Sequence, residues 1–336
     1  MYYTRALFLR LFLALVLLVT GGAGILAQDS DKGEQSPVYV LTIDGAIGPA
    51  FHDYLQKGLK KAKKADSQLV VIALNTPGGL LSTTREMTSA IVASPVPVAV
   101  YVTPAGGRAA SAGTFITYAA DIAAMAPGTN IGAATPIKMG GSGVPGMGKK
   151  KDNDDNKDLK SAAEKKSIED TAAFIRGLAE LRGRNAEWAQ KAVTAAKSIT
   201  AEEALEKGVI DYMADTRGAL LKALDGKKLD TGKTRTTTLT TKDAPVKMYD
   251  PGPRTKFMAL ITDPNIAFIL MTVGIYGLIL EFYNPGTFIP GVIGAICLTI
   301  GLFAMNVLPV NTAGVLLILL GVAFMVGESL APSFGL

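Results

Sequence analysis

The chain has very few of the residues that build disulfides, metal centres and thiol sites. Among its 336 residues there is one cysteine, Cys297, and one histidine, His52. A lone cysteine inside an apolar run excludes an internal disulfide and argues against both a cysteine-based metal site and a thiol nucleophile. A lone histidine argues against a metal site built on imidazoles. We therefore expect no metal and no cofactor, and a serine–histidine enzyme would depend on His52.

Charge is scarce in the last part of the chain. From 257 to 336 there is no lysine, arginine or histidine, and only three acidic residues are present. Three apolar runs, broken by YNPG and LPVN, lie at about 266–282, 288–307 and 313–326. This composition predicts an all-α transmembrane region of about three helices over 258–336. The chain stops at a turn without a polar tail, so we expect a shortened version of a longer membrane region.

The N-terminus has the pattern of a secretory signal over 1–28. Arg5 and Arg10 precede a short apolar core, and small residues lead to Ala27. We therefore expect the following domain on the extracytoplasmic side of the membrane. Arg254 and Lys256, just before the first apolar run, favour the cytoplasm by the positive-inside rule. We give the signal more weight, because a folded domain has to follow it across the membrane.

The net charge of +5 does not indicate a nucleic-acid partner. The clearest basic cluster, 149–151, is followed at once by an acidic run at 152–155 and has no interleaved aromatic residues. Mixed charge beside glycine and serine is typical of a solvated loop. We expect no nucleic-acid binding.

The middle of the chain alternates between two hydrophobic periods. Apolar runs typical of buried parallel strands are separated by stretches with helical spacing. The expected strands are 38–43, 68–75, 96–102 and 122–127, and the expected helices begin near Gly48 and cover 83–92 and 111–120. The pattern predicts an α/β domain with a parallel sheet over 29–225, followed by a linker at 226–257.

Two glycine-rich loops follow successive strands. They are NTPGG, Asn75–Gly79, and PAGGRAASAG, Pro104–Gly113, and the second contains Ser111. Taken alone, a serine among small residues more often serves close packing than chemistry. However, loops at the carboxyl ends of parallel strands gather ligands, and glycines let backbone N–H groups approach them. Two such loops together predict a site that includes Ser111.

Four motifs, in this order, carry a resemblance to a known family. They are LNTPGG, GGRAASAGT, MAPGTNIGAATPI and SITAEEALEKGVID. Together they resemble the NfeD-type membrane-bound serine proteases, relatives of the ClpP peptidases and signal peptide peptidase A, over Val38–Ala214. The three C-terminal runs resemble the NfeD membrane region. The resemblance implies a ClpP/crotonase-like α/β fold followed by a helical transmembrane region. Taken alone, NTPGG also suits the crotonase superfamily, which shares this fold.

The resemblance implies a serine–lysine dyad. Its nucleophile falls on Ser111, and its lysine, placed 17 residues before Gly183 of a GRN motif, falls on Lys166. Lys165 is the adjacent alternative, and we expect a helix to begin at Lys166. Without the resemblance, Lys166 would be interpreted as a solvated lysine in a charged segment.

The residues support a lysine base independently of the spacing. ClpP-type triads place a histidine after the serine, near Pro136 here, and this chain has none at that point. Another group must accept the serine proton. Lys138 lies close to the missing histidine and is kept as a rival to Lys166. His52 precedes the first glycine loop, and we expect it to be structural.

A lysine that acts as a base must be neutral. Shifting a lysine pKa from about 10.4 to about 7 requires about 4.6 kcal/mol, which burial in an apolar cleft can supply. The glycine-rich, charged segment 140–160 is expected to be a mobile loop. We therefore expect the site to form fully when substrate or a second subunit orders this loop and Lys166. A homodimer or larger homo-oligomer is expected.

These observations predict a membrane-anchored serine endopeptidase. The backbone N–H groups of Gly78 and Gly79, and that of Ala112, would hold the oxyanion. The resemblance implies hydrophobic segments of membrane-associated proteins as substrates and stomatin-like proteins as partners. A non-catalytic membrane scaffold is the alternative, followed by a crotonase-like acyl-CoA enzyme, which the signal sequence disfavours. The resemblance implies more spans and a C-terminal OB-type barrel in full-length relatives, so we expect a shortened form here.

Overall fold

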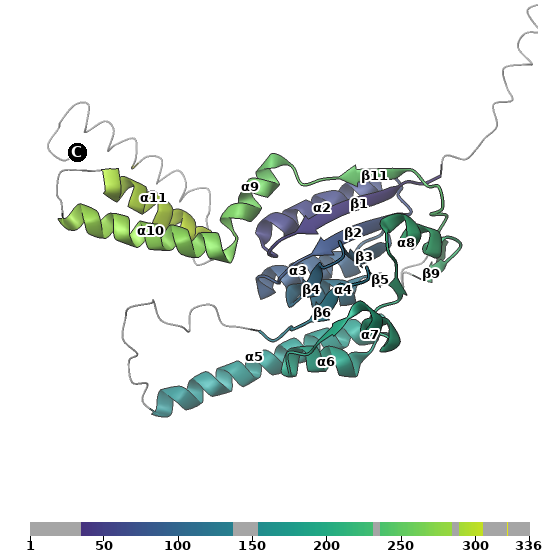
Figure 1. Cartoon of the computed structure of the whole chain (residues 1–336), viewed down its shortest axis with the longest axis horizontal. Helices are drawn as coiled ribbons and strands as arrows, with labels where there is room; N and C mark the ends of the chain where they lie inside the picture. Colours follow the sequence, from purple (N-terminus) through teal and green to yellow (C-terminus); the bar gives the residue numbers. More distant parts are fainter. Residues whose placement is uncertain (1–34, 137–153, 231–235, 284–288, 305–320, 322–336) are drawn as a thin grey trace, which may run out of the picture. The chain divides into compact units, whose positions relative to one another are not determined.

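The structure is a computed structural model of the whole chain. It describes residues 35–136, 154–230, 236–283, 289–304 and 321 (Figure 1). The predicted signal, Lys138 and the apolar run at 313–326, apart from Gly321, lie outside the described residues. The chain divides into two units, Met1–Ser36 and Pro37–Leu336, and the elements below belong to the second.

A six-stranded parallel sheet forms the centre of the soluble part, with strand order β11-β1-β2-β3-β5-β8 (Figure 1). In chain order the strands are β1 Val38–Asp44, β2 Leu69–Asn75, β3 Val98–Val102, β5 Ile122–Met125, β8 Tyr212–Met213 and β11 Val246–Tyr249. The central strands are apolar along their whole length because both of their faces are buried. The four strands predicted from these runs are confirmed.

Helices cover both faces of this sheet. They are α2 Pro49–Lys64, α3 Leu81–Val92, α4 Ala112–Ala119, α5 Asp154–Leu181, α6 Ala186–Thr194, α7 Ala201–Glu206 and α8 Arg217–Leu224. Alternate residues of β1 enter two separate cores: Leu41 belongs to the core that includes residues of α2 to α7, whereas Val40 belongs to the core that includes residues of α8. This alternation follows from the two-residue period of a strand.

Helix α5 begins well before the residue predicted from the sequence. The expected start at Lys166 is wrong, because α5 starts at Asp154 and already includes the last part of the segment expected to be a loop. The residues from 154 to 165 are mostly good helix formers, and two aspartates favour the N-terminal end of a helix. The charged residues of this stretch therefore belong to a helix and not to a loop.

Several short strands have no counterpart in the predicted elements. A three-stranded sheet is formed by β4 Arg108–Ala110, β6 Asn130–Gly132 and β7 Ser198–Thr200, in the order β4-β6-β7. A hairpin is formed by β9 Lys228–Asp230 and β10 Thr236–Thr238. The segment expected as a linker, 226–257, also supplies β11, which pairs with β1 at one edge of the main sheet.

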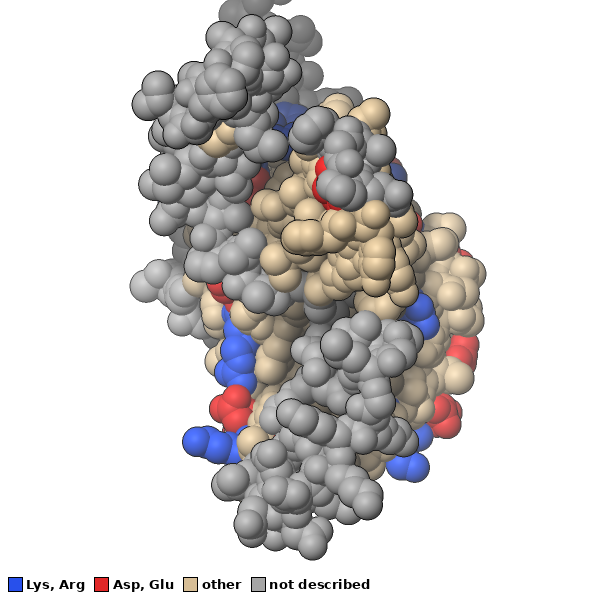
Figure 2. Space-filling model, turned by 90° about the vertical axis from the view of Figure 1, so that its left-hand side faces the viewer, with Lys and Arg blue, Asp and Glu red and all other residues tan. Residues whose placement is uncertain are grey.

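The C-terminal helices are α9 Pro253–Ile261, α10 Pro264–Tyr283 and α11 Ile289–Ala304. Asn265–Tyr283 is long and apolar enough to cross a membrane, and α11 is a shorter apolar helix. Glycines let the two helices approach, since a Cβ on Gly277 would lie 2.9 Å from Gly294 Cα. In Figure 2 most of the described residues in the middle of this face are uncharged, and charged residues lie around them.

Candidate active site

Ser111 occupies a strained turn between β4 and α4. Its backbone angles are φ 50° and ψ −111°, a region that residues other than glycine rarely adopt. Such strain persists only where the surroundings fix it, and it is concentrated at functional sites. Here the Ser111 N–H donates to the carbonyl oxygen of Gly132 at 2.9 Å, and Thr114 N–H donates to Ser111 O at 3.0 Å. The turn places Ser111 immediately before the first turn of α4.

Gly132 at the end of β6 is the residue that anchors this turn. Its carbonyl oxygen also accepts the hydroxyl of Thr114 at 3.0 Å, and that hydroxyl lies 2.9 Å from Ala109 O. Gly132 has φ 133°, and a Cβ there would lie 2.2 Å from Lys197 O, so only glycine fits. Sequence reasoning did not assign Gly132 a role. Its signal was the MAPGTNIGAATPI motif, which contains it.

The first glycine loop lies directly against Ser111. A Cβ on Gly78 would lie 2.7 Å from Ser111 Cβ and 3.2 Å from its Oγ, and Gly78 has φ 123°. Both the close approach and the positive φ require glycine at this position. The structure thus brings together the two loops that the sequence singled out, at the carboxyl ends of β2 and β3.

The three N–H groups predicted to hold an oxyanion differ in their surroundings. Gly78 N–H donates to Thr76 Oγ1 at 3.1 Å. Within the described residues, the N–H groups of Gly79 and Ala112 donate to no acceptor. Ile47 bonds the residues on either side of Gly79, and Ala112 begins α4, where unpaired N–H groups carry partial positive charge. Gly79 and Ala112 are therefore the open donors of the site.

Asn75 and Thr76 connect the two loops. Asn75 Oδ1 accepts the N–H of Arg108 at 3.1 Å, and Asn75 Nδ2 donates to Asp44 Oδ1 at 2.9 Å. Thr76 exchanges backbone hydrogen bonds with Arg108 and Ala110, just before the Ser111 turn. These contacts fix the Gly78 loop relative to Ser111.

Lys166 is exposed on α5, and the structure shows no contact between it and Ser111. It has no hydrogen bond or ion pair with another described residue. The helix is anchored further along: Phe174 stacks on Phe115 of α4 at 5.5 Å, and Asp170 binds Arg85 of α3 at 2.6 Å. Lys166 lies one helical turn before Asp170. Lys165, the adjacent alternative, is also exposed.

His52 is engaged away from the serine. Its Nδ1 lies 3.2 Å from Glu86 Oε2, and its Nε2 lies 3.0 Å from Gln56 Nε2. His52 is on α2 and Glu86 is on α3, so the histidine ties these two helices together. This arrangement accords with the structural role expected for His52.

The C-terminal end of α4 is held by two arginines that sequence reasoning left without a role. Arg184 Nη1 donates to the carbonyl oxygens of Thr117, Tyr118 and Ala120, and its Nη2 pairs with Asp211 at 2.6 Å. Arg182 donates to Ala119 O at 2.9 Å and pairs with Asp121. These cations bind the carbonyl groups left unpaired at a helix C-terminus. The helix that presents Ser111 is thereby fixed at its far end.

Comparison with known proteins places both parts of the chain. Residues 37–236 match the N-terminal domain of NfeD1b, and residues 265–336 match the NfeD integral membrane domain. The membrane-bound protease PH1510 of Pyrococcus horikoshii is 34% identical over 331 residues, which are 97% of this chain and 70% of that protein. The membrane protein NfeD1b of Bacillus subtilis is 28% identical over 314 residues, or 87% of this chain and 63% of that protein.

Solved structures of a related protease show the same fold. They are of the 1510-N membrane-bound stomatin-specific protease. A lysine-to-alanine mutant in complex with a substrate peptide is 32% identical with a TM-score of 0.58, covering 68% of this chain and 99% of that one. A serine-to-alanine mutant is 32% identical with a TM-score of 0.55, covering 65% of this chain and 99% of that one.

The fold, and the likeness to the membrane-bound protease and its serine and lysine mutants, define a serine peptidase of the membrane-bound class. The ClpP/crotonase-like fold class was predicted as an α/β domain with a parallel sheet followed by a helical membrane region, and this architecture is confirmed. The chain belongs to the NfeD family of membrane proteins, with the NfeD1b N-terminal domain and the NfeD membrane domain in the same order.

Proposed function

We propose that the protein is a membrane-anchored serine endopeptidase that uses Ser111 as nucleophile and Lys166 as base. The observation that carries the proposal is the strained Ser111 turn at the start of α4, with Gly78 packed against it. A nucleophile on such a turn is exposed to a substrate carbonyl, and the adjacent helix N-terminus supplies N–H donors. The predicted position of the catalytic lysine and the mutated serine and lysine of the related protease support the same pair of residue types.

The proposed reaction begins with attack of Ser111 Oγ on a peptide carbonyl carbon. Lys166 accepts the hydroxyl proton and then protonates the leaving amine, so the peptide bond breaks and an acyl-serine ester forms. Water hydrolyses this ester by the same route. Gly79 and Ala112 N–H stabilise the oxyanion, and Gly78 provides the space that lets the loop approach Ser111.

Lys166 must move toward Ser111 for this reaction. It lies one turn before Asp170, the point at which α5 is tied to α3, and its side chain is exposed. We propose that bound substrate or a second copy of the chain brings Lys166 to Ser111. Lys138, outside the described residues, is the rival base.

The proposed substrates are hydrophobic segments of membrane-associated proteins, and stomatin-like proteins are the proposed partners. The support is that the related solved protease is stomatin-specific by name and that the chain carries the NfeD membrane domain. We also propose that the protease domain lies on the extracytoplasmic side and that the membrane region crosses more than once. The predicted signal supports the first, and the apolar helices α10 and α11 support the second.

The test is cleavage of a hydrophobic, stomatin-derived peptide by the full chain in detergent. Wild type should cut, Ser111→Ala and Lys166→Ala should be inactive, and Lys165→Ala serves as the matched neighbour that keeps activity. If Lys166→Ala remains active and Lys138→Ala does not, the base is Lys138. The exposed position of Lys166 favours one alternative, a non-catalytic scaffold. The scaffold alternative is supported if the wild type cuts no peptide and Ser111 does not react with a fluorophosphonate.

A further inference from the structure

A single segment joins the soluble domain to the first long apolar helix. We call residues 246–262 the strap; it runs from β11 through α9 to Thr262. It lies between the two parts of the chain that match the NfeD domains, which end at 236 and begin at 265. Helix α10 starts at Pro264, only two residues after Thr262. If α10 moves, the strap is therefore the first part of the preceding chain to be displaced.

The first half of the strap is firmly attached to the soluble domain. β11 pairs in parallel with β1, from Val38 and Val246 onward. The hydroxyl of Tyr54 on α2 accepts the N–H of Thr42 at 3.0 Å and donates to the carbonyl oxygen of Tyr249. The rings of Tyr54 and Tyr249 also stack, with centroids 5.3 Å apart. The strap is thus fixed up to Tyr249.

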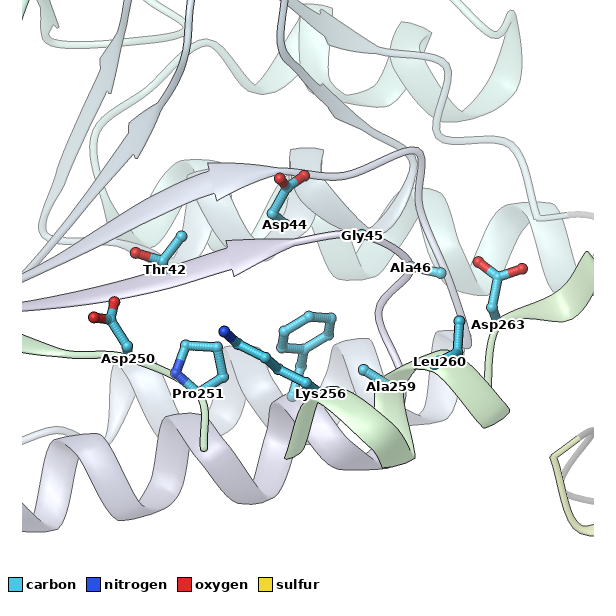
Figure 3. Close-up of a pocket in the computed structure, with 11 residues that line it drawn as sticks. Thr42, Asp44, Gly45, Ala46, Asp250, Pro251, Lys256, Ala259, Leu260 and Asp263 are labelled. Carbon is cyan, nitrogen blue, oxygen red and sulfur yellow. The ribbon is translucent and has the colours of Figure 1, made fainter. Parts of the chain in front are cut away.

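The second half of the strap comes close to the soluble domain at Gly48. A Cβ on Gly48 would lie 3.3 Å from Thr262 Oγ1 and 3.8 Å from Thr262 Cβ. Gly48 has φ −145° and ψ 178°, which any residue can adopt, so the space beside Thr262 distinguishes glycine from alanine here. Beside this contact a cavity of about 530 Å³ separates α9 from the end of β1. Figure 3 shows Asp44 and Gly45 on one side of the cavity, with Leu260 on the other.

The segment Asp44–Gly48, which ends at this contact, is hydrogen-bonded to the first glycine loop, Asn75–Gly79, and to Leu80. We call this glycine loop the oxyanion loop. Ile47 N–H donates to Gly78 O at 2.7 Å, and Leu80 N–H donates to Ile47 O at 3.0 Å. A Cβ on Gly79 would lie only 2.0 Å from Ile47 O, so the two backbones are packed without intervening side chains. A shift of Ile47 therefore shifts the N–H of Gly79.

We propose that Gly48 and Thr262 are positioning residues of the active site. The contact between Gly48 and Thr262, at the end of α9, sets the position of Ile47. Ile47 in turn sets the position of the oxyanion loop. Proteolytic rate then depends on how the membrane-proximal helix is seated. The catalytic readout of this proposal rests on the proposed function, whereas its structural readout does not.

The experiment uses the full chain in detergent micelles with Gly48→Ala. The added methyl group pushes against Thr262, so we expect the backbone amides of Ile47 and Leu80 to exchange hydrogen about tenfold faster than in wild type. We expect fluorophosphonate labelling of Ser111 to slow by about tenfold through the misplaced oxyanion loop. The matched control is Gly252→Ala, on the same strap, because a Cβ there meets no atom within 4 Å.

Thr262→Ala combined with Gly48→Ala provides the decisive variant. Removing the threonine side chain makes room for the new methyl group, so both readouts should return toward wild type. The proposal is overturned if Gly48→Ala leaves amide exchange at the level of the control, or if the double variant is no better than Gly48→Ala. Amide exchange needs no substrate, so a wild-type chain inert toward peptides would end the proposed function and still leave this result to decide the role of the strap.

Discussion

Gly78 and Ser111 approach so closely that a Cβ on the glycine would lie 2.7 Å from Ser111 Cβ. We predict that Gly78→Ala reduces reaction of Ser111 with a fluorophosphonate by at least about 100-fold, because the loop that carries the oxyanion donors must move away. Gly106→Ala is the control: Gly106 also has a positive φ, 81°, but its Cβ would meet no atom within 4 Å. Equal labelling of both variants would show that close packing at Gly78 does not matter.

Thr114→Val is predicted to loosen the turn at Ser111. Its hydroxyl bonds the carbonyl oxygens of Ala109 and Gly132 and is fully buried, so its loss should lower the free energy of unfolding by about 1–2 kcal/mol. Thr194→Val removes an exposed hydroxyl that bonds Gln190 O at 3.1 Å and should change stability by less than about 0.5 kcal/mol. Urea unfolding of the two variants measures the difference, and equal effects would contradict the prediction.

Arg184→Gln is predicted to be among the most destabilising single changes in the soluble domain. It leaves Asp211 without its ion pair and several α4 carbonyl groups without a donor, at a cost of about 3–5 kcal/mol. Arg176→Gln removes an exposed arginine 4.0 Å from Glu180 and should cost less than about 0.5 kcal/mol. Denaturant midpoints should separate the pair clearly; a mild effect at Arg184 would mean that α4 holds its position without the clamp.

Alkaline pH is predicted to weaken the attachment of the strap. Burial raises the pKa of Tyr54 from 10.0 to about 12. The folded state therefore favours the protonated phenol. Its contribution is fully present below pH 10 and is lost as pH rises from about 10 to about 12, because the unfolded chain ionises first.

Tyr54→Phe supplies the comparison for this pH effect. The variant should be less stable near neutral pH, since it lacks the hydroxyl that joins Thr42 to Tyr249. Its stability should fall less steeply above pH 10. Burial also raises the pKa of Tyr101 and Tyr118, so some alkaline loss should remain. Unfolding midpoints between pH 8 and pH 12 give both slopes, and parallel slopes would rule out Tyr54 as the source.

Much of the sheet could be predicted because its central strands are buried on both faces. Runs such as Gln68–Asn75 have no polar alternation and are followed by turn residues such as TPGG, so they can be recognised from composition alone. The carboxyl ends of neighbouring parallel strands meet at one edge, which is why two glycine loops distant in sequence could be assigned to one site. Gly78 and Ser111 lie together there.

The remaining elements depend on contacts that the sequence does not display. β11 is four residues long and largely exposed, so its pairing with β1 has no apolar signal. Gly132 anchors Ser111 through a carbonyl oxygen, which no side chain reveals. The early start of α5 was hidden by its charge. The pairing of Lys166 with Ser111 depends on the placement of a helix end, and it stays a prediction.

The pairing of β11 with β1 has a consequence for the order in which the protein forms. β1 leaves the ribosome early, yet its outer edge stays open until Val246–Tyr249 has been synthesised. Such a pairing closes a loop of most of the domain, and contacts of this kind form late. Tyr249 precedes Pro264, the first residue of α10, by only 15 residues. The sheet therefore cannot be completed until the chain has been made to within 15 residues of its first long apolar helix.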